Sequence, residues 1–178
     1  MNRRAERGFT LVEIMIVVAI IALLAAIAIP NVLRGRTTAN EAASIGNLRA
    51  LVSSQEMYRS VNNRYSQTAT WQANMYTNPD PDFGPPSFNL DLSAAQTVQG
   101  YNYTYAGLPA GCTDAAGNCT QYTLSTVAQT LGRTGVRSFI ADDTGVIRHC
   151  TATAQGQTAD PTGAGQDATI DAPPVNCD

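Results

Sequence analysis

The apolar stretch between Phe9 and Ile29 constrains the possible structures of this chain more than any other part of its sequence. Its only charged residue is Glu13, and Pro30 follows it directly. An α-helix rises about 1.5 Å per residue, so about 20 apolar residues suffice to cross the hydrocarbon core of a bilayer. We therefore expect a membrane-spanning helix over residues 9–29.

Charged residues at the start of the chain indicate how this helix would be oriented. Arg3, Arg4 and Arg7 precede it, which predicts a cytoplasmic N-terminus and an exported remainder after Pro30. A carboxylate in lipid costs about 2.5 to 3.5 kcal/mol even on lenient insertion scales, so Glu13 is predicted to have a function.

The hexamer at residues 8–13, Gly-Phe-Thr-Leu-Val-Glu, lies between the basic leader and the apolar run. In this context it resembles the class III signal of type IV pilins and type II secretion pseudopilins, and the resemblance covers roughly residues 7–36. It implies that a prepilin peptidase cleaves after Gly8 and methylates the new amino terminus at Phe9. It also implies that Glu13 neutralises the amine of a neighbouring subunit when helices bundle into a filament.

Elementary chemistry supports this pairing independently. A free amine on Phe9 is largely protonated at neutral pH, and burying it in an apolar bundle is as unfavourable as burying Glu13. Pairing the two groups between subunits removes both penalties. A subunit docked out of register would leave both charges buried and unpaired, at a cost of about 3 to 5 kcal/mol.

Two other interpretations of the N-terminus remain open. A secretory signal peptide also has a basic start and a small-residue cleavage site, which Ala26-Ile27-Ala28 imitates, but its apolar core is usually about 7 to 15 residues. The run here is longer and contains Glu13. A plain single-pass anchor with an incidental acid is the second alternative, and a filament subunit is preferred over both.

The remaining sequence suits one outer domain on this helix. Apolar residues recur at helical spacing as far as Val61, so we extend the helix to about Asn62. Pro30 and Gly35 are expected to let it bend or melt locally between residues 26 and 35. The predicted divisions are a cleaved basic leader, a transmembrane and assembly half, an amphipathic half and a globular head: 1–8, 9–29, 30–62 and 63–178.

The sequence of the head predicts a loop followed by a sheet. Residues 66–86 are polar and proline-rich, which predicts a connecting loop. Alternation at 101–105, Tyr, Thr and Val at 121–128, a short, partly apolar run at 137–141 and a tight turn leading into 146–149 predict three or four antiparallel strands linked by short loops between about 100 and 150. The tyrosines at 101, 103 and 105 are interpreted as one face of this sheet rather than a binding platform. The expected class is α+β, and the family resemblance implies a pilin-like α/β-roll.

All four cysteines fall on the side predicted to be exported, which favours two disulfides over redox or metal chemistry. Among the three possible connectivities we choose local pairing, Cys112 with Cys119 and Cys150 with Cys177. The second bridge would tie segment 150–177 to the last strand, and it resembles the disulfide-bounded C-terminal loop of type IV pilins.

Charge and composition argue against several function classes. The net charge is −3, and beyond Arg64 three arginines face ten acids, so no nucleic-acid groove is predicted. His149 is the single histidine, which leaves no second ligand for a metal pair. Turns explain the acid pairs 80/82 and 142/143 better than calcium sites do. We expect no catalytic residues, no metal and no cofactor.

The predicted function is structural. A single-pass inner-membrane precursor with a cytoplasmic N-terminus would be processed by the prepilin peptidase and methylase, extracted by inner-membrane assembly machinery, and packed with copies of itself into an extracellular pilus. The alternative is a major-type pseudopilin of a type II secretion system, although residues 151–178 do not resemble the calcium-binding end of that protein. A membrane-anchored adhesin or enzyme is the remaining option.

Overall fold

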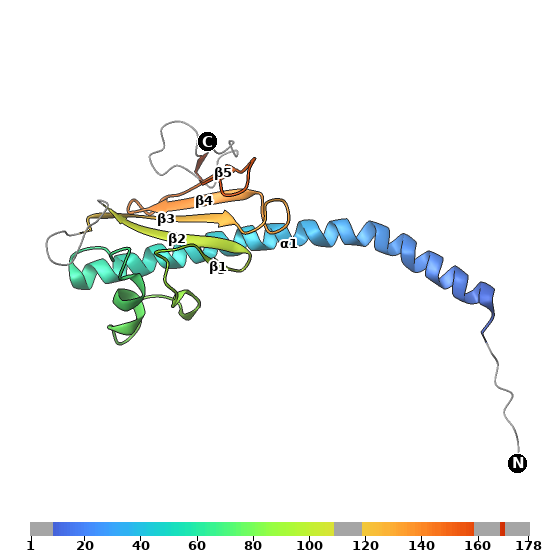
Figure 1. The fold of residues 1–178 in the computed structure, drawn as a ribbon, viewed down its shortest axis with the longest axis horizontal. Coiled ribbons are helices and arrows are strands. Elements are labelled where there is room, and N and C mark those ends of the chain that lie inside the picture. Colours follow the sequence, from blue (N-terminus) through green and yellow to red (C-terminus); the bar gives the residue numbers. More distant parts are fainter. Residues whose placement is uncertain (1–8, 109–118, 159–167, 170–178) are drawn as a thin grey trace, which may run out of the picture. The chain divides into compact units, whose positions relative to one another are not determined.

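The computed structural model describes residues 9–108, 119–158 and 168–169. The chain divides into two compact units, Met1–Arg36 and Thr37–Asp178, and the long helix contributes to both. The elements, in chain order, are α1 (Leu11–Asn62), the π-helix η1 (Ala73–Thr77), the 3-10 helix η2 (Pro86–Phe88), β1 (Gln96–Val98), β2 (Tyr101–Leu108), β3 (Gln121–Ala128), β4 (Arg137–Asp142), β5 (Ile147–Thr151) and β6 (Ala168–Thr169) (Figure 1).

Helix α1 is continuous from Leu11 to Asn62, which is also the end expected from its sequence. The next residue, Asn63, has φ 56° and donates its backbone N–H to the carbonyl of Arg59 at 2.7 Å. Asparagine is one of the few residues that adopt this left-handed conformation readily, so it terminates the helix as a glycine would.

The strands form one antiparallel meander with spatial order β1-β2-β3-β4-β5-β6. Of these, β1 and β6 were not predicted, and β2 runs three residues further than expected, to Leu108. A two-residue turn joins β1 to β2, and both of its residues, Gln99 and Gly100, have positive φ. This is the backbone twist that favours a tight hairpin. At the β4-β5 turn the N–H of Gly145 donates to the carbonyl of Asp142 at 3.0 Å.

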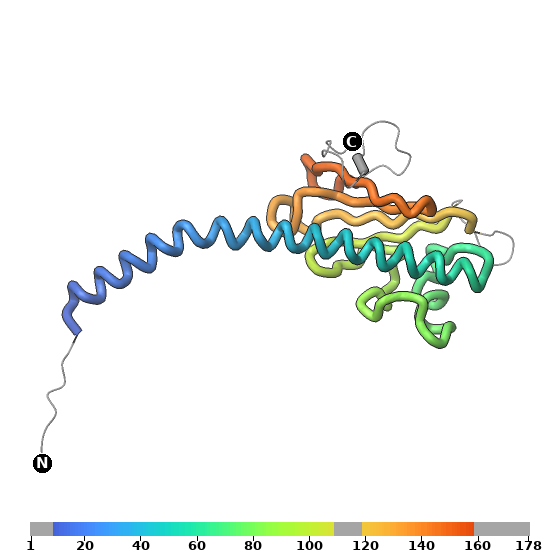
Figure 2. Tube along the Cα trace, turned by 180° about the vertical axis from the view of Figure 1, so that it is seen from behind, coloured from blue at the N-terminus to red at the C-terminus, as the bar shows by residue number. Residues whose placement is uncertain are grey.

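One face of the sheet lies against the part of α1 that belongs to the second unit (Figure 2). Tyr101, Tyr103 and Tyr105 alternate along β2 with their side chains fully buried in this core. The prediction that these tyrosines form one face of the sheet is therefore confirmed. A long N-terminal helix packed on an antiparallel sheet also confirms the predicted α+β class.

Buried polar contacts hold α1 in register with the sheet and the loop. Ser44 and Thr126 share a hydroxyl hydrogen bond of 2.9 Å. Further along the helix, the Oε1 of Gln55 accepts from the N–H of Ser66 at 3.2 Å and from the hydroxyl of Tyr105 at 3.3 Å. A buried amide without such partners would lose about 1 to 3 kcal/mol, so these bonds favour one docking position of the helix.

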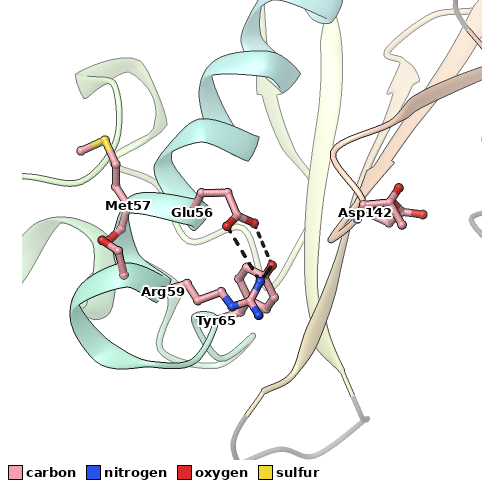
Figure 3. Close-up of polar contacts among 7 residues, drawn as sticks. Glu56, Met57, Arg59, Tyr65 and Asp142 are labelled. Carbon is pink, nitrogen blue, oxygen red and sulfur yellow. Dashed lines mark hydrogen bonds and ion pairs between the residues drawn. The ribbon is translucent and has the colours of Figure 1, made fainter.

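The segment after α1 folds back on the last turns of the helix. The hydroxyl of Tyr65 donates to Glu56 at 2.7 Å and accepts from Arg59 at 2.8 Å. Figure 3 shows these three side chains converging beside the helix end, with Asp142 apart from them on its own strand. The turn after the helix is thereby fastened to it.

Candidate functional site

The N-terminal part of α1, within residues 9–36, presents apolar side chains to all sides. Phe9 is 78% exposed, and large apolar residues remain exposed as far as Leu33. The helix is long and apolar enough to span a membrane, and none of its most apolar window is buried by the part of the chain that the structure describes. An apolar surface of this extent indicates a site that lipid or other helices cover.

The first turn of α1 begins with a capping contact. The backbone N–H of Glu13 donates to the side-chain oxygen of Thr10 at 3.2 Å. Thr10 thus satisfies one of the amide groups that a helix start leaves without an intrahelical partner. Thr-x-x-Glu is also the spacing of a capping box, and a carboxylate near a helix N-terminus is electrostatically favourable.

Pro30 lies inside α1, and the helix passes through it and Gly35 without interruption. We predicted that the helix either bends or melts locally between residues 26 and 35. The structure shows no local melting there, and the bend stays a prediction. Because proline has no N–H, it cannot donate to the carbonyl one turn earlier. The next residue, Asn31, donates its side-chain amide to the carbonyl of Ile27 at 3.2 Å.

The structure describes some of the functional residues predicted from the sequence, and others lie outside the described residues. Phe9 and Glu13 both lie exposed at the start of the first unit, whereas Gly8 is outside the described residues. Cys119 and Cys150 are fully buried and disulfide-bonded. Their predicted partners at positions 112 and 177 lie outside the described residues, so the two pairings stay predictions.

Sequence reasoning missed two contributors to this site. The Thr-x-x-Glu spacing signals Thr10 as the cap, but the hexamer that contains it was interpreted only through a family resemblance. Asn31 carried no comparable signal, because its backbone-directed hydrogen bond depends on the side-chain rotamer.

Comparison with known proteins bears on the same end of the chain. Residues 3–29 match the prokaryotic N-terminal methylation motif. The match spans the basic leader from Arg3 onward and the whole apolar run, including Phe9 and Glu13. The motif therefore coincides with the exposed apolar surface described above.

The chain is similar to two named pilins. It is 49% identical over 63 residues to the type IV wide pilus major component PilA4 of Thermus thermophilus, covering 35% of this chain and 48% of that protein. It is 49% identical over 64 residues to the type IV major pilin protein PilA of Myxococcus xanthus, covering 36% of this chain and 29% of that protein.

The chain is also similar to the type II secretion system core protein G of Pseudomonas aeruginosa, at 33% identity over 91 residues. That match covers 51% of this chain and 64% of the relative. The chain thus spans less than two thirds of each of these three relatives. No solved structure matches this one.

Proposed function

We propose that this protein is a structural subunit of a type IV pilus-like surface filament, cleaved after Gly8, methylated at Phe9 and polymerised through the N-terminal part of α1. The observation that supports this most directly is the combination of a methylation motif with a long apolar helix that no described part of the chain covers. A soluble monomer would leave this surface in water, whereas a membrane and then a bundle of like helices would each cover it.

Within such a bundle, Glu13 and the amine of Phe9 would serve as a register pair between subunits. Glu13 has no ion-pair partner among the residues that the structure describes. The only cation that the cleavage itself creates is the new amine. Pairing across subunits stabilises the correct stagger, because any other stagger buries two unpaired charges.

The second unit would form the outer surface of the filament. Its fold around the sheet, tied to α1 by buried polar contacts, provides a rigid body that follows the helix during assembly. The role of the chain is then structural rather than catalytic. The N-terminus would be cytoplasmic in the precursor, and the second unit would be exported, where the two predicted disulfides can form.

A major-type pseudopilin of a type II secretion system is the second candidate. The observation that favours it is the length of the matches to core protein G, which reach 91 residues against 64 for the pilins. Such a subunit would build a short periplasmic filament rather than a surface fibre.

Shearing of intact cells followed by mass spectrometry tests the proposal. A pilus subunit is expected in the sheared fraction as a chain that begins at Phe9 and carries one additional methyl group. If the chain is recovered only from the cell envelope, and deletion of its gene abolishes enzyme export, the results would favour the pseudopilin instead. A chain that retains residues 1–8 in the assembled filament would contradict the proposed processing.

A further inference from the structure

A pocket of about 410 Å³ lies in the second unit, between the C-terminal end of α1 and the segment 74–83. Its size falls within the range of small-molecule sites in proteins, about 300 to 1,000 Å³. Three asparagine amides, one guanidinium and two aromatic rings are among the groups that line it, from Asn62, Asn74, Asn78, Arg64, Tyr58 and Phe83. This lining takes no part in the proposed polymerisation surface.

Two of the amides are held in place by the protein itself. The Nδ2 of Asn62 donates to the carbonyl of Tyr58 at 3.1 Å, and the Nδ2 of Asn74 donates to the hydroxyl of Thr70 at 2.8 Å. A side-chain amide has two donor hydrogens and two acceptor lone pairs, so each amide keeps a donor and an acceptor for a ligand. Fixing these groups in advance lowers the entropic cost of binding.

The wall of the pocket formed by segment 74–83 is anchored by backbone hydrogen bonds. The N–H of Asn78 donates to the carbonyl of Ala73, and that of Phe83 donates to the carbonyl of Met75, each at 3.0 Å. The ring of Phe83 meets that of Tyr58 edge to face, with centroids 5.3 Å apart. Phe83 is only half-buried and thus offers apolar ring surface to a ligand.

The charges around the pocket disfavour ionic ligands of either sign. Asp80 and Asp82 are exposed on segment 74–83, and the C-terminal end of α1 is the negative pole of the helix; together these negative charges outweigh the single positive charge of Arg64, so an anion is disfavoured. Among the described residues that line the pocket, none carries a carboxylate and Arg64 carries a positive charge, so the described lining gives a cation no ion-pair partner. Amides interleaved with apolar rings instead suit a neutral molecule that carries both hydroxyl groups and C–H faces.

We infer that this pocket binds a neutral saccharide, with its hydroxyl groups on the asparagine amides and a sugar face on Phe83. Such a site would give the outer surface of the proposed filament a binding function that the polymerisation surface does not supply. Because the pocket belongs entirely to the second unit, binding does not require assembly, and the two proposals fail independently.

Saturation-transfer NMR on the full chain tests this inference, in a detergent without a sugar headgroup. The probes are the methyl glycosides of glucose, galactose and N-acetylglucosamine, with galacturonate and glucosamine as charged counterparts. At least one neutral glycoside is expected to bind, and Asn78→Ala to weaken it roughly five-fold, the size of effect that one hydrogen bond produces. Gln129→Ala removes an exposed amide just beyond the far end of β3 and should leave binding unchanged.

Three results would overturn the inference. They are the absence of a signal from every neutral glycoside, full binding by the Asn78→Ala variant, and binding of galacturonate or glucosamine at least as strong as that of the neutral sugars. The circular dichroism spectrum of each variant checks that its fold is intact, which Asn78→Ala should preserve because the substituted side chain is exposed.

Discussion

Glu41 on α1 and Arg137 on β4 form a two-point ion pair in which the Oε2 of the glutamate lies 2.8 Å from both Nε and Nη2 of the arginine. The other carboxylate oxygen accepts the backbone N–H groups of Val136 at 2.9 Å and Arg137 at 3.3 Å. The side chain of Glu41 is only 7% exposed. One buried carboxylate therefore fixes where the helix crosses the start of β4.

Replacing Glu41 by alanine is expected to destabilise the second unit by about 3 kcal/mol, because Arg137 would be left largely buried without its counter-charge. Chemical unfolding of the full chain in detergent, followed by tryptophan fluorescence, measures the effect. Asp82→Ala is the control, since this carboxylate in the same unit is exposed to solvent, and should cost no more than about 0.5 kcal/mol. Equal effects of the two substitutions would contradict this account.

Gly135→Ala is expected to destabilise the second unit by about 1 to 3 kcal/mol through overpacking. A Cβ at this buried position would overlap the hydroxyl and ring of Tyr101. That side chain cannot move away freely, because its hydroxyl donates to the carbonyl of Arg137 at 2.9 Å. Gly46→Ala is the matched substitution: it meets open space within α1 and should stabilise by about 0.5 to 1 kcal/mol. Thermal denaturation of both variants checks the opposite signs.

The buried tyrosines predict alkaline unfolding. Burial raises the pKa of Tyr101, Tyr105 and Tyr122, and burial together with the hydrogen bond to Glu56 raises the pKa of Tyr65 to about 12. The folded state thus retains phenolic protons that the unfolded state releases near pH 10. The resulting stability is complete below pH 10 and is lost as the pH rises through 12.

Ultraviolet absorbance of the phenolate, recorded together with circular dichroism across this range, measures the coupling. Most of the phenolate signal is expected to appear with loss of the fold rather than before it. Ionisation of all tyrosines near pH 10 with an intact spectrum would show that the rings are not buried as described.

Glu13→Ala is expected to reduce the number of surface filaments severely, because the new amine of Phe9 would be buried unpaired in the bundle. Electron microscopy of sheared material measures filament number and length. Arg49→Ala, which removes an exposed charge from α1 in the second unit, is the control and should assemble normally. Filaments of ordinary number and length from the Glu13→Ala variant would refute the register pairing.

Thr10→Ala is expected to fray the first turn of α1, at a cost of about 1 kcal/mol, because the N–H of Glu13 loses its acceptor. Thr10→Ser keeps the acceptor and serves as the control. Amide hydrogen exchange at residues 11–14 in detergent micelles measures the difference, and equal protection in both variants would contradict the capping role.

The sheet illustrates which local structures could be predicted. Strands β2 and β3 carry alternation or β-branched residues over five or more positions, so their existence followed from the pattern. Strand β4 was predicted from a short, partly apolar run, and β5 from the tight turn at residues 143–145 that precedes it. In contrast, β1 has only three residues and β6 two, and both depend on pairing with a longer neighbour. The Gln99-Gly100 turn lacks the Asn-Gly or Asp-Gly pair that signals a tight hairpin, so only its positive φ angles reveal it.

The candidate site and the core were predictable to different degrees. The apolar run with Glu13 was evident because a long uninterrupted pattern needs no tertiary information. The partners of Gln55 and Glu41 were not evident, because a polar residue in an amphipathic helix is normally predicted to be exposed. Their partners, Tyr105 and Arg137, lie 50 or more positions away in the chain, and only the fold brings them beside the helix.

Local sequence patterns alone determined a single long helix with an apolar first part, its end near Asn62 and the antiparallel pairing of the strands in the head. The helix follows from the spacing of apolar side chains, its end from turn-forming residues, and the antiparallel pairing from links too short for a parallel crossover. Only the tertiary structure decided which polar groups are buried in pairs, which face of the sheet receives α1, and where the asparagine-lined pocket opens. These depend on contacts between residues far apart in the chain, whose free energies no local pattern records.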